Sequence, residues 1–337
     1  MRHGVAVLAL LVVAGLVVFA LTRLDLHQTG HALANASPGW IALALFLMGA
    51  SLVLRSISWH QTLRAALPDT VLRWPPVVRA TMIGVMASAV FPGRVGEPTR
   101  VVVLARRLEG STRRHLPVVA GTVFSQTLIN LLALGILLAV TFTSVPWLNG
   151  NIAGVAGALA VPFALCLVVL AGPRLLVLAH RSHWQRLRLA AGLVDRLLRL
   201  ARQGLAVFAR PRYGSTAITS QLLAWALQWL ACYCVLLALG LQHQAGLVAA
   251  AAVLLAVNLS AVVPATPSNV GVFQAACVVV LAAYGVGTGS GVAYGILLQA
   301  VEVVTALALG VPALLGEGLG WRDMRAVGET SAGESAE

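Results

Sequence analysis

The chain has 337 residues, of which 59% are hydrophobic and 10% charged, and its mean hydropathy is +0.89. This composition excludes a water-soluble domain, and apolar runs without polar–apolar alternation exclude a membrane β-barrel. The net charge is +12 and all 23 basic side chains are arginine, which excludes Schiff-base chemistry and a Walker-type phosphate loop. We therefore predict an all-α polytopic membrane protein with about six to eight spans.

The arginines concentrate between the apolar runs, a pattern typical of cytoplasmic loops that face anionic lipid. On this basis we predict a multi-pass protein of the cytoplasmic membrane with both termini on the cytoplasmic side. Nucleic acid is not expected as a partner, because the sequence offers no soluble basic domain to bind it.

The first apolar segment, Gly4–Thr22, is predicted to cross the membrane, with Arg2 before it and Arg23 after it. A cleaved signal peptide is the alternative, since Ala34-Asn35-Ala36 resembles a processing site. The apolar run is too long for a signal core and lies far from that site, so we predict an uncleaved helix.

A short external loop is predicted next, and it contains His27 and His31. Zinc needs three or four ligands, and no third ligand accompanies these two, so we predict no metal site. The second span is predicted over about residues 38–54. It ends at Arg55 and Trp59, which we interpret as residues of the membrane interface.

The segment Val77–Phe91 is barely long enough to cross, and arginines are frequent on both sides of it. A crossing would place one basic loop outside, against the positive-inside rule. We therefore predict a re-entrant helix that breaks at Pro92-Gly93 and returns through residues 98–107. Pro98 suits the first turn of the returning helix, where its missing N–H costs nothing.

Three further spans are predicted over residues 116–140, 152–171 and 216–239. Residues 172–215, between the last two, have leucines on one face and arginines on another, which favours a cytoplasmic amphipathic helix on anionic lipid. A plain solvated connector is the alternative.

Two apolar arms, 247–263 and 270–286, flank a second break, and a re-entrant hairpin and two full crossings are both open for them. The last span is predicted over residues 292–315. The membrane domain then covers residues 1–316, and residues 317–337 form a flexible cytoplasmic tail.

The two breaks share a frame, since Ser88-Ala89-Val90-Phe91-Pro92 and Ser260-Ala261-Val262-Val263-Pro264 both read Ser-Ala-Val-x-Pro and each is followed by Val-Gly. Matching breaks in two halves of a membrane protein indicate a substrate site between inverted repeats. We therefore predict two re-entrant or broken helix pairs related by an inverted repeat. Accidental repetition in a chain rich in Ala, Val and Gly is the alternative.

Arg94, Glu97 and Arg100 follow the first break and are candidate substrate-binding residues. The planar fork of arginine suits phosphate oxygens, and Glu97 would neutralise one arginine when no substrate is bound. Weak ion pairs at the cytoplasmic surface are the alternative explanation.

The other candidate substrate-binding residues are polar or acidic groups at membrane depth, where such groups are functional candidates by default. Interhelical hydrogen bonding is the alternative for those on long helices. No catalytic acid, base or nucleophile set is evident, so we predict neither an enzyme nor a cofactor. The six residues are Gln126 and Asn130 in a predicted span, Thr266, Ser268 and Asn269 at the second break, and Glu302, which shares a face with Gln299.

Several motifs together resemble the flippase-like membrane domain of lysylphosphatidylglycerol synthases, over roughly Trp40–Leu315. They are Arg55-Ser56-Ile57-Ser58-Trp59, Pro92-Gly93-Arg94-Val95-Gly96-Glu97 with Arg100, and Pro264-Ala265-Thr266-Pro267 with Gly271 and Phe273.

The chain departs from the family where Glu-Arg-x-x-Asp is replaced by Gln126-Thr127-Leu128-Ile129-Asn130, and Pro-Gly-Gly by Pro267-Ser268-Asn269. The family also often has an arginine near Gln299. Neutral groups thus replace several charges, so the resemblance does not imply a shared substrate. No aminoacyl-transferase domain precedes Glu337, so we expect no lysyl-lipid synthesis.

The resemblance implies a transporter that moves a lipid, or a lipid-linked anionic headgroup, across the membrane. The expected partner is therefore a membrane lipid with an anionic headgroup. The first alternative is a non-transporting membrane partner that presents lipid to a separate lipid-modifying enzyme. A membrane-embedded lipid-modifying enzyme is the second alternative.

Overall fold

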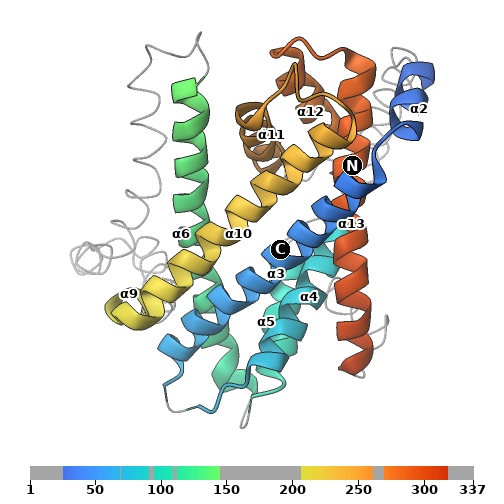
Figure 1. Ribbon diagram of the computed structural model, residues 1–337. Coiled ribbons are helices and arrows are strands. Elements are labelled where there is room, and N and C mark those ends of the chain that lie inside the picture. The colour runs from blue at the N-terminus through green and yellow to red at the C-terminus, as the bar shows by residue number, and fades with distance from the viewer. Residues whose placement is uncertain are drawn as a thin grey trace, which may run out of the picture. The chain divides into compact units, whose positions relative to one another are not determined.

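The computed structural model describes residues 26–68, 70–90, 95–108, 112–144, 206–260 and 269–317. All regular secondary structure in these ranges is helical (Figure 1). Within them, four helices are long and apolar enough to cross a membrane: α3 (Pro38–Ala66), α6 (Thr112–Ser144), α10 (Pro211–Ala238) and α13 (Thr288–Gly316). The predicted class, an all-α multi-pass membrane protein, is confirmed.

The remaining helices of the described ranges are short. Neither α11, with 14 residues, nor α12, with 11, reaches the about 20 residues of a crossing, and the two pack against each other. The short helices are α2 (Leu26–Ala34), α4 (Trp74–Val90), α5 (Gly96–Ala105), α9 (Ala206–Ala209), α11 (Leu247–Ser260) and α12 (Val272–Ala282).

Four predicted spans coincide with α3, α6, α10 and α13, and the helices extend beyond most of the predicted ends. The apolar run sets the membrane-embedded part, whereas backbone hydrogen bonding continues past it until a cap or break ends the helix. The predicted spans Gly4–Thr22 and 152–171, and the connector up to residue 205, lie outside the described residues.

Two interpretations of the N-terminal third are wrong. Trp59 is not an interfacial residue, because α3 continues to Ala66 and the indole is completely buried among neighbouring helices. The predicted loop containing His27 and His31 is helix α2, which places the two histidines one turn apart. Asn35 caps that turn by donating from Nδ2 to the carbonyl oxygen of His31 at 2.9 Å.

The chain divides into two compact units, each assembled from distant segments. The first unit comprises residues 1–48, 88–94 and 228–306, and the second comprises residues 49–87, 95–227 and 307–337. Residues of α3, α4, α10 and α13 are divided between the units.

In the first unit, glycines bring α12 and α13 close together. A Cβ added at Gly291 would lie 3.3 Å from Val278, and one at Gly295 would lie 3.0 Å from the Cα of Gln274. This Gly-x-x-x-Gly spacing replaces side chains with backbone contact, a common way to pack helices in lipid. Tyr294, between them, donates its hydroxyl to the carbonyl oxygen of Cys232 at 2.9 Å, which joins α13 to α10.

In the second unit, α5 lies alongside α4, and Pro98 lies in its first turn (Figure 1). The re-entrant path stays a prediction. The approach is close at Gly84, where an added Cβ would lie 2.8 Å from the carbonyl oxygen of Gly96. The break itself, residues 91–94, lies outside the described residues. Helix α5 also packs against α6.

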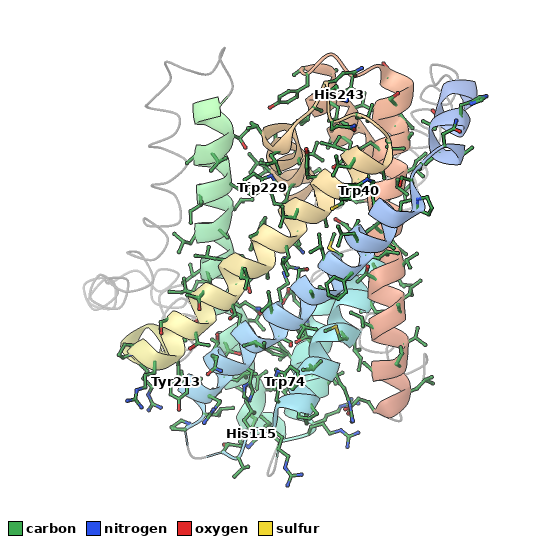
Figure 2. The ribbon with its side chains drawn as sticks, in the orientation of Figure 1. Trp40, Trp74, His115, Tyr213, Trp229 and His243 are labelled. Atoms are coloured by element: carbon green, nitrogen blue, oxygen red, sulfur yellow. The ribbon has the colours of Figure 1, made fainter. Side chains whose placement is uncertain are left out.

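Several aromatic and histidine side chains of the second unit lie toward one end of its helices. Figure 2 shows Trp74, His115 and Tyr213 there, at the starts of α4, α6 and α10. Arg64, near the end of α3, lies over the Tyr213 ring, 5.5 Å from its centroid. The arginine-bearing ends of these helices therefore share one side of this unit.

Close packing of α13 on α4 gives a stability prediction. A Cβ added at Gly310 would lie only 2.4 Å from the Cβ of Met86, too close to be accommodated without moving a helix. We expect Gly310→Ala to lower the free energy of unfolding by about 1–3 kcal/mol, measured by thermal unfolding in detergent. Gly39→Ala, where nothing lies within 4 Å, is the control and should be close to neutral. Equal stability of both variants would contradict the close packing.

Candidate functional site

The second unit contains a buried guanidinium, that of Arg100 in the second turn of α5. Only 8% of this residue is exposed. Charged groups are buried at tolerable cost only when hydrogen-bonded or paired. Nη1 donates to Oε1 of Gln126 at 2.8 Å, and Nη2 forms an ion pair with the carboxylate of Glu97. Nε is buried and has no hydrogen-bond partner among the described residues.

Trp59 covers one face of this guanidinium. The guanidinium carbon lies 4.7 Å from the indole centroid, a cation–π contact that contributes roughly 2 kcal/mol when desolvated. The ring is held in place because its Nε1 donates to Oγ1 of Thr122 on α6 at 3.0 Å. Trp59 therefore lines the site and stacks on its cation, a role that was not predicted from the sequence.

Gln126 connects Arg100 to a line of amides between α6 and α10. Its Nε2 donates to the carbonyl oxygen of Arg55 at 3.3 Å and, more weakly, to Oε1 of Gln221 at 3.5 Å. Gln221 in turn donates to Oδ1 of Asn130 at 2.6 Å, and the same oxygen accepts from Nε1 of Trp225 at 3.1 Å. Hydrogen bonds thus run from Arg100 to Trp225 through three amides.

Gln221 was not predicted, although it is completely buried at the centre of this line. The sequence held one signal for it, an amide within the apolar stretch of α10, which also carries Gln228. Gln126 and Asn130, which the sequence singled out as a polar stripe one turn apart, both belong to the network. They join helices, as the alternative interpretation stated, and Gln126 also contacts the buried charge.

The two members of the ion pair differ in exposure. The Arg100 side chain is 10% exposed, whereas that of Glu97 is 53% exposed. Removing the arginine from its partners would leave a buried charge unpaired, but Glu97 can return to water at little cost. The carboxylate is therefore the exchangeable partner, and the guanidinium is the fixed one.

The second break contributes fewer described groups. Thr266 and Ser268 of this break lie outside the described residues, as does Arg94 of the first break. Asn269 belongs to the first unit, has a left-handed backbone (φ 58°) that asparagine tolerates well, and donates to Oγ of Ser260 at 3.5 Å. Asn269 therefore helps to close the turn that leads into α12.

Glu302 also lies in the first unit, partly buried on α13. One turn earlier, Gln299 accepts from Nε2 of Gln274 at 2.5 Å, and Gln274 accepts from the backbone N–H of Gly271 at 2.7 Å. Hydrogen bonds thus link Gln299 on α13 to the start of α12.

The predicted site residues therefore fall into two described sets. Glu97, Arg100, Gln126 and Asn130 are brought together in the second unit, and Asn269 and Glu302 lie in the first. Within the described ranges, no group of three or more His, Cys, Asp or Glu side chains is arranged to hold a metal ion. The set around Arg100 is suited to binding an anion.

Comparison with known families places the chain in a family of membrane proteins. The family model described as the lysylphosphatidylglycerol synthase TM region matches residues 6–310, which include all the helices described above except the last turns of α13. No curated protein matches the sequence.

The Arg100–Gln126 contact gives a second stability prediction. Gln126→Leu keeps a side chain of similar size but leaves Nη1 of Arg100 without an acceptor. We therefore expect a loss of about 1–3 kcal/mol in the free energy of unfolding. Thermal unfolding in detergent measures it. The matched control is Thr127→Leu, since the neighbouring Thr127 is exposed and bonds only to its own helix. A Gln126→Leu protein as stable as this control would show that the amide does not support the buried charge.

Proposed function

The chain belongs to the lysylphosphatidylglycerol synthase transmembrane-region family, and from this premise we propose that it moves a lipid with an anionic headgroup between the leaflets of the cytoplasmic membrane. The family description names the membrane region of a lipid-modifying synthase. The observation that carries the proposal is the buried Arg100, whose carboxylate partner is exchangeable.

The chemistry of Arg100 favours a phosphate or similar oxyanion as ligand. Nε and Nη2 lie on the same edge of a guanidinium and together donate two parallel hydrogen bonds to an oxyanion. In this structure Nη2 holds Glu97 and Nε has no described partner. An arriving headgroup that displaces Glu97 gains both donors, while Gln126 and Trp59 keep the guanidinium in place.

The neutral amides support the same proposal. Gln126 satisfies one N–H of the guanidinium without cancelling its charge. When Glu97 leaves, the positive charge is therefore available to the headgroup, and when the headgroup leaves, Glu97 replaces it. Alternation between an internal and a substrate anion keeps the buried arginine paired in both states, which lowers the barrier to moving the headgroup.

We propose transport rather than catalysis because of the groups that touch Arg100. They are a carboxylate, an amide and an indole. This set stabilises an anion, but it contains no nucleophile paired with a general base, which bond-breaking chemistry requires. A separate enzyme would then synthesise or modify the transported lipid.

Transport is tested with the purified protein in liposomes that carry a fluorescent anionic phospholipid in one leaflet. We expect Arg100→Gln to reduce the rate of lipid movement by about tenfold to a hundredfold, since charged hydrogen bonds are lost, and Arg100→Lys to reduce it less. Glu97→Gln removes the competing charge and should lower the lipid concentration at half-maximal rate.

The control is Arg106→Gln, which removes the same charge from an exposed position at the end of α5. Wild-type transport by a well-expressed Arg100→Gln protein would overturn the proposal. If the wild-type protein moves no lipid alone but does so with added membrane enzymes, it presents lipid to a partner. A new lipid species formed by the pure protein would indicate an enzyme.

Orientation is tested by cysteine labelling. We propose that the arginine-bearing ends of α3, α5 and α6 face the cytoplasm. In a background with the four native cysteines replaced by alanine, Arg106→Cys should resist an impermeant maleimide in intact cells and react after permeabilisation. His243→Cys, in the loop between α10 and α11, should react in intact cells. Labelling of Arg106→Cys in intact cells would show that these helix ends face outward, which contradicts the proposed orientation.

A further inference from the structure

A second cluster of charged side chains lies in the second unit, where α4 begins and where α5 and α13 end. Glu317 follows the last residue of α13. Its carboxylate accepts from Nη1 of Arg79 at 3.4 Å and from Nε of Arg107 at 2.5 Å. Arg107 Nη2 also donates to the Glu317 carbonyl oxygen at 3.1 Å. Glu317 falls in the tail that was predicted to be flexible, and neither arginine had a predicted role.

Arg107 caps α13 in this arrangement. The last carbonyl groups of a helix lack intrahelical partners and carry partial negative charge, which a cation stabilises. By contacting both the carboxylate and the carbonyl oxygen of one residue, Arg107 satisfies this helix end and neutralises the acid beside it. The cluster is thus a built structure rather than a chance meeting of surface charges.

The charges of the cluster do not balance, and the positive ones face outward. Two guanidiniums meet one carboxylate, and the Glu317 side chain is 3% exposed, whereas those of Arg79 and Arg107 are 45% and 49% exposed. Arg79 uses only Nη1 and Arg107 only Nε and Nη2 in the described contacts. Donors of both guanidiniums are therefore available at the surface for another anion.

The neighbouring side chains indicate that this anion belongs to a lipid. Trp74 at the start of α4 is partly exposed (Figure 2), Val71 just before it is highly exposed, and so is Leu315 beside Glu317. Arginines together with exposed aliphatic and indole groups at helix ends are characteristic of the level where headgroups meet acyl chains. A free phosphate ion would gain nothing from these apolar neighbours.

We propose that Arg79 and Arg107 bind the phosphodiester of an anionic phospholipid, with Glu317 positioning both guanidiniums from the buried side. This site is separate from Arg100 and does not depend on the proposed transport, since it lies at the base of the α4–α5 pair. The lipid would be retained as a bound ligand at the membrane surface rather than moved.

The experiment measures retention of phosphatidylglycerol against phosphatidylcholine by native mass spectrometry of the full-length protein. In Arg79→Gln the ratio of bound phosphatidylglycerol to phosphatidylcholine should fall at least about tenfold, because a charged donor disappears. Glu317→Gln should raise the ratio several-fold, since it removes the negative charge while the amide oxygen still accepts from Arg107. Arg106→Gln, an exposed arginine outside the cluster, is the control and should leave the ratio unchanged.

A lipid site predicts that Arg79→Gln lowers the phosphatidylglycerol ratio and Glu317→Gln raises it, and a purely structural ion pair does not. If the cluster only holds helices together, Arg79→Gln and Glu317→Gln both break it, and retention falls or stays unchanged in both, which overturns the proposal. Arg79→Lys covers the case in which Arg79→Gln fails to fold, and it should retain an intermediate ratio. Inorganic phosphate protecting the detergent-solubilised protein from heat as well as phosphatidylglycerol does would overturn the lipid assignment.

Discussion

Much of the second unit is arranged around a single constraint, the burial of a guanidinium in a bundle that lipid surrounds. An arginine side chain has five N–H donors, and each one withdrawn from water needs an acceptor. Glu97 on its own helix and Gln126 on α6 accept from two nitrogens of Arg100, and the ring of Trp59 on α3 covers one face of the guanidinium, whereas Nε has no acceptor among the described residues. Gln126 then needs partners of its own, so the network extends to Gln221 and α10. Helix packing here follows from hydrogen-bond satisfaction as much as from apolar contact.

The spans were predictable because charge-free runs in this sequence have few interpretations. The α4–α5 pair was expected because arginines flank a segment barely long enough to cross, and its re-entrant path stays a prediction. Helix ends were less so: nothing in the apolar pattern shows that α3 continues past Arg55, and so Trp59 was wrongly placed at the interface. Gln126 and Asn130 stood out as a pair one turn apart, whereas Gln221 is one of two widely spaced glutamines in α10 and its partners lie on another helix. Glu317 was assigned to the tail because its two partners are more than 200 residues away in sequence.

The amides near Arg100 also clarify what the departures from the family pattern mean. Where the family often has acids, this chain has Gln126 and Asn130, and the structure puts the first of these in direct contact with the guanidinium. A carboxylate at that position would neutralise Arg100 permanently from the buried side. With an amide there, the charge is balanced by Glu97 alone among the contacts described, and Glu97 is the member that water can reach.

The cap formed by Arg107 and Glu317 has a mechanical consequence. Arg79 belongs to the outgoing limb of the α4–α5 pair and Arg107 follows the returning limb, and both are tied to the same carboxylate at the end of α13. Both limbs are thus linked to α13 through one carboxylate, and these two contacts oppose shear between the limbs. Gly310, against Met86, leaves no gap along α4 through which α13 could slide. The limbs are therefore held together at their base through Glu317, and they approach each other closely again at Gly84, where an added Cβ would lie 2.8 Å from the carbonyl oxygen of Gly96.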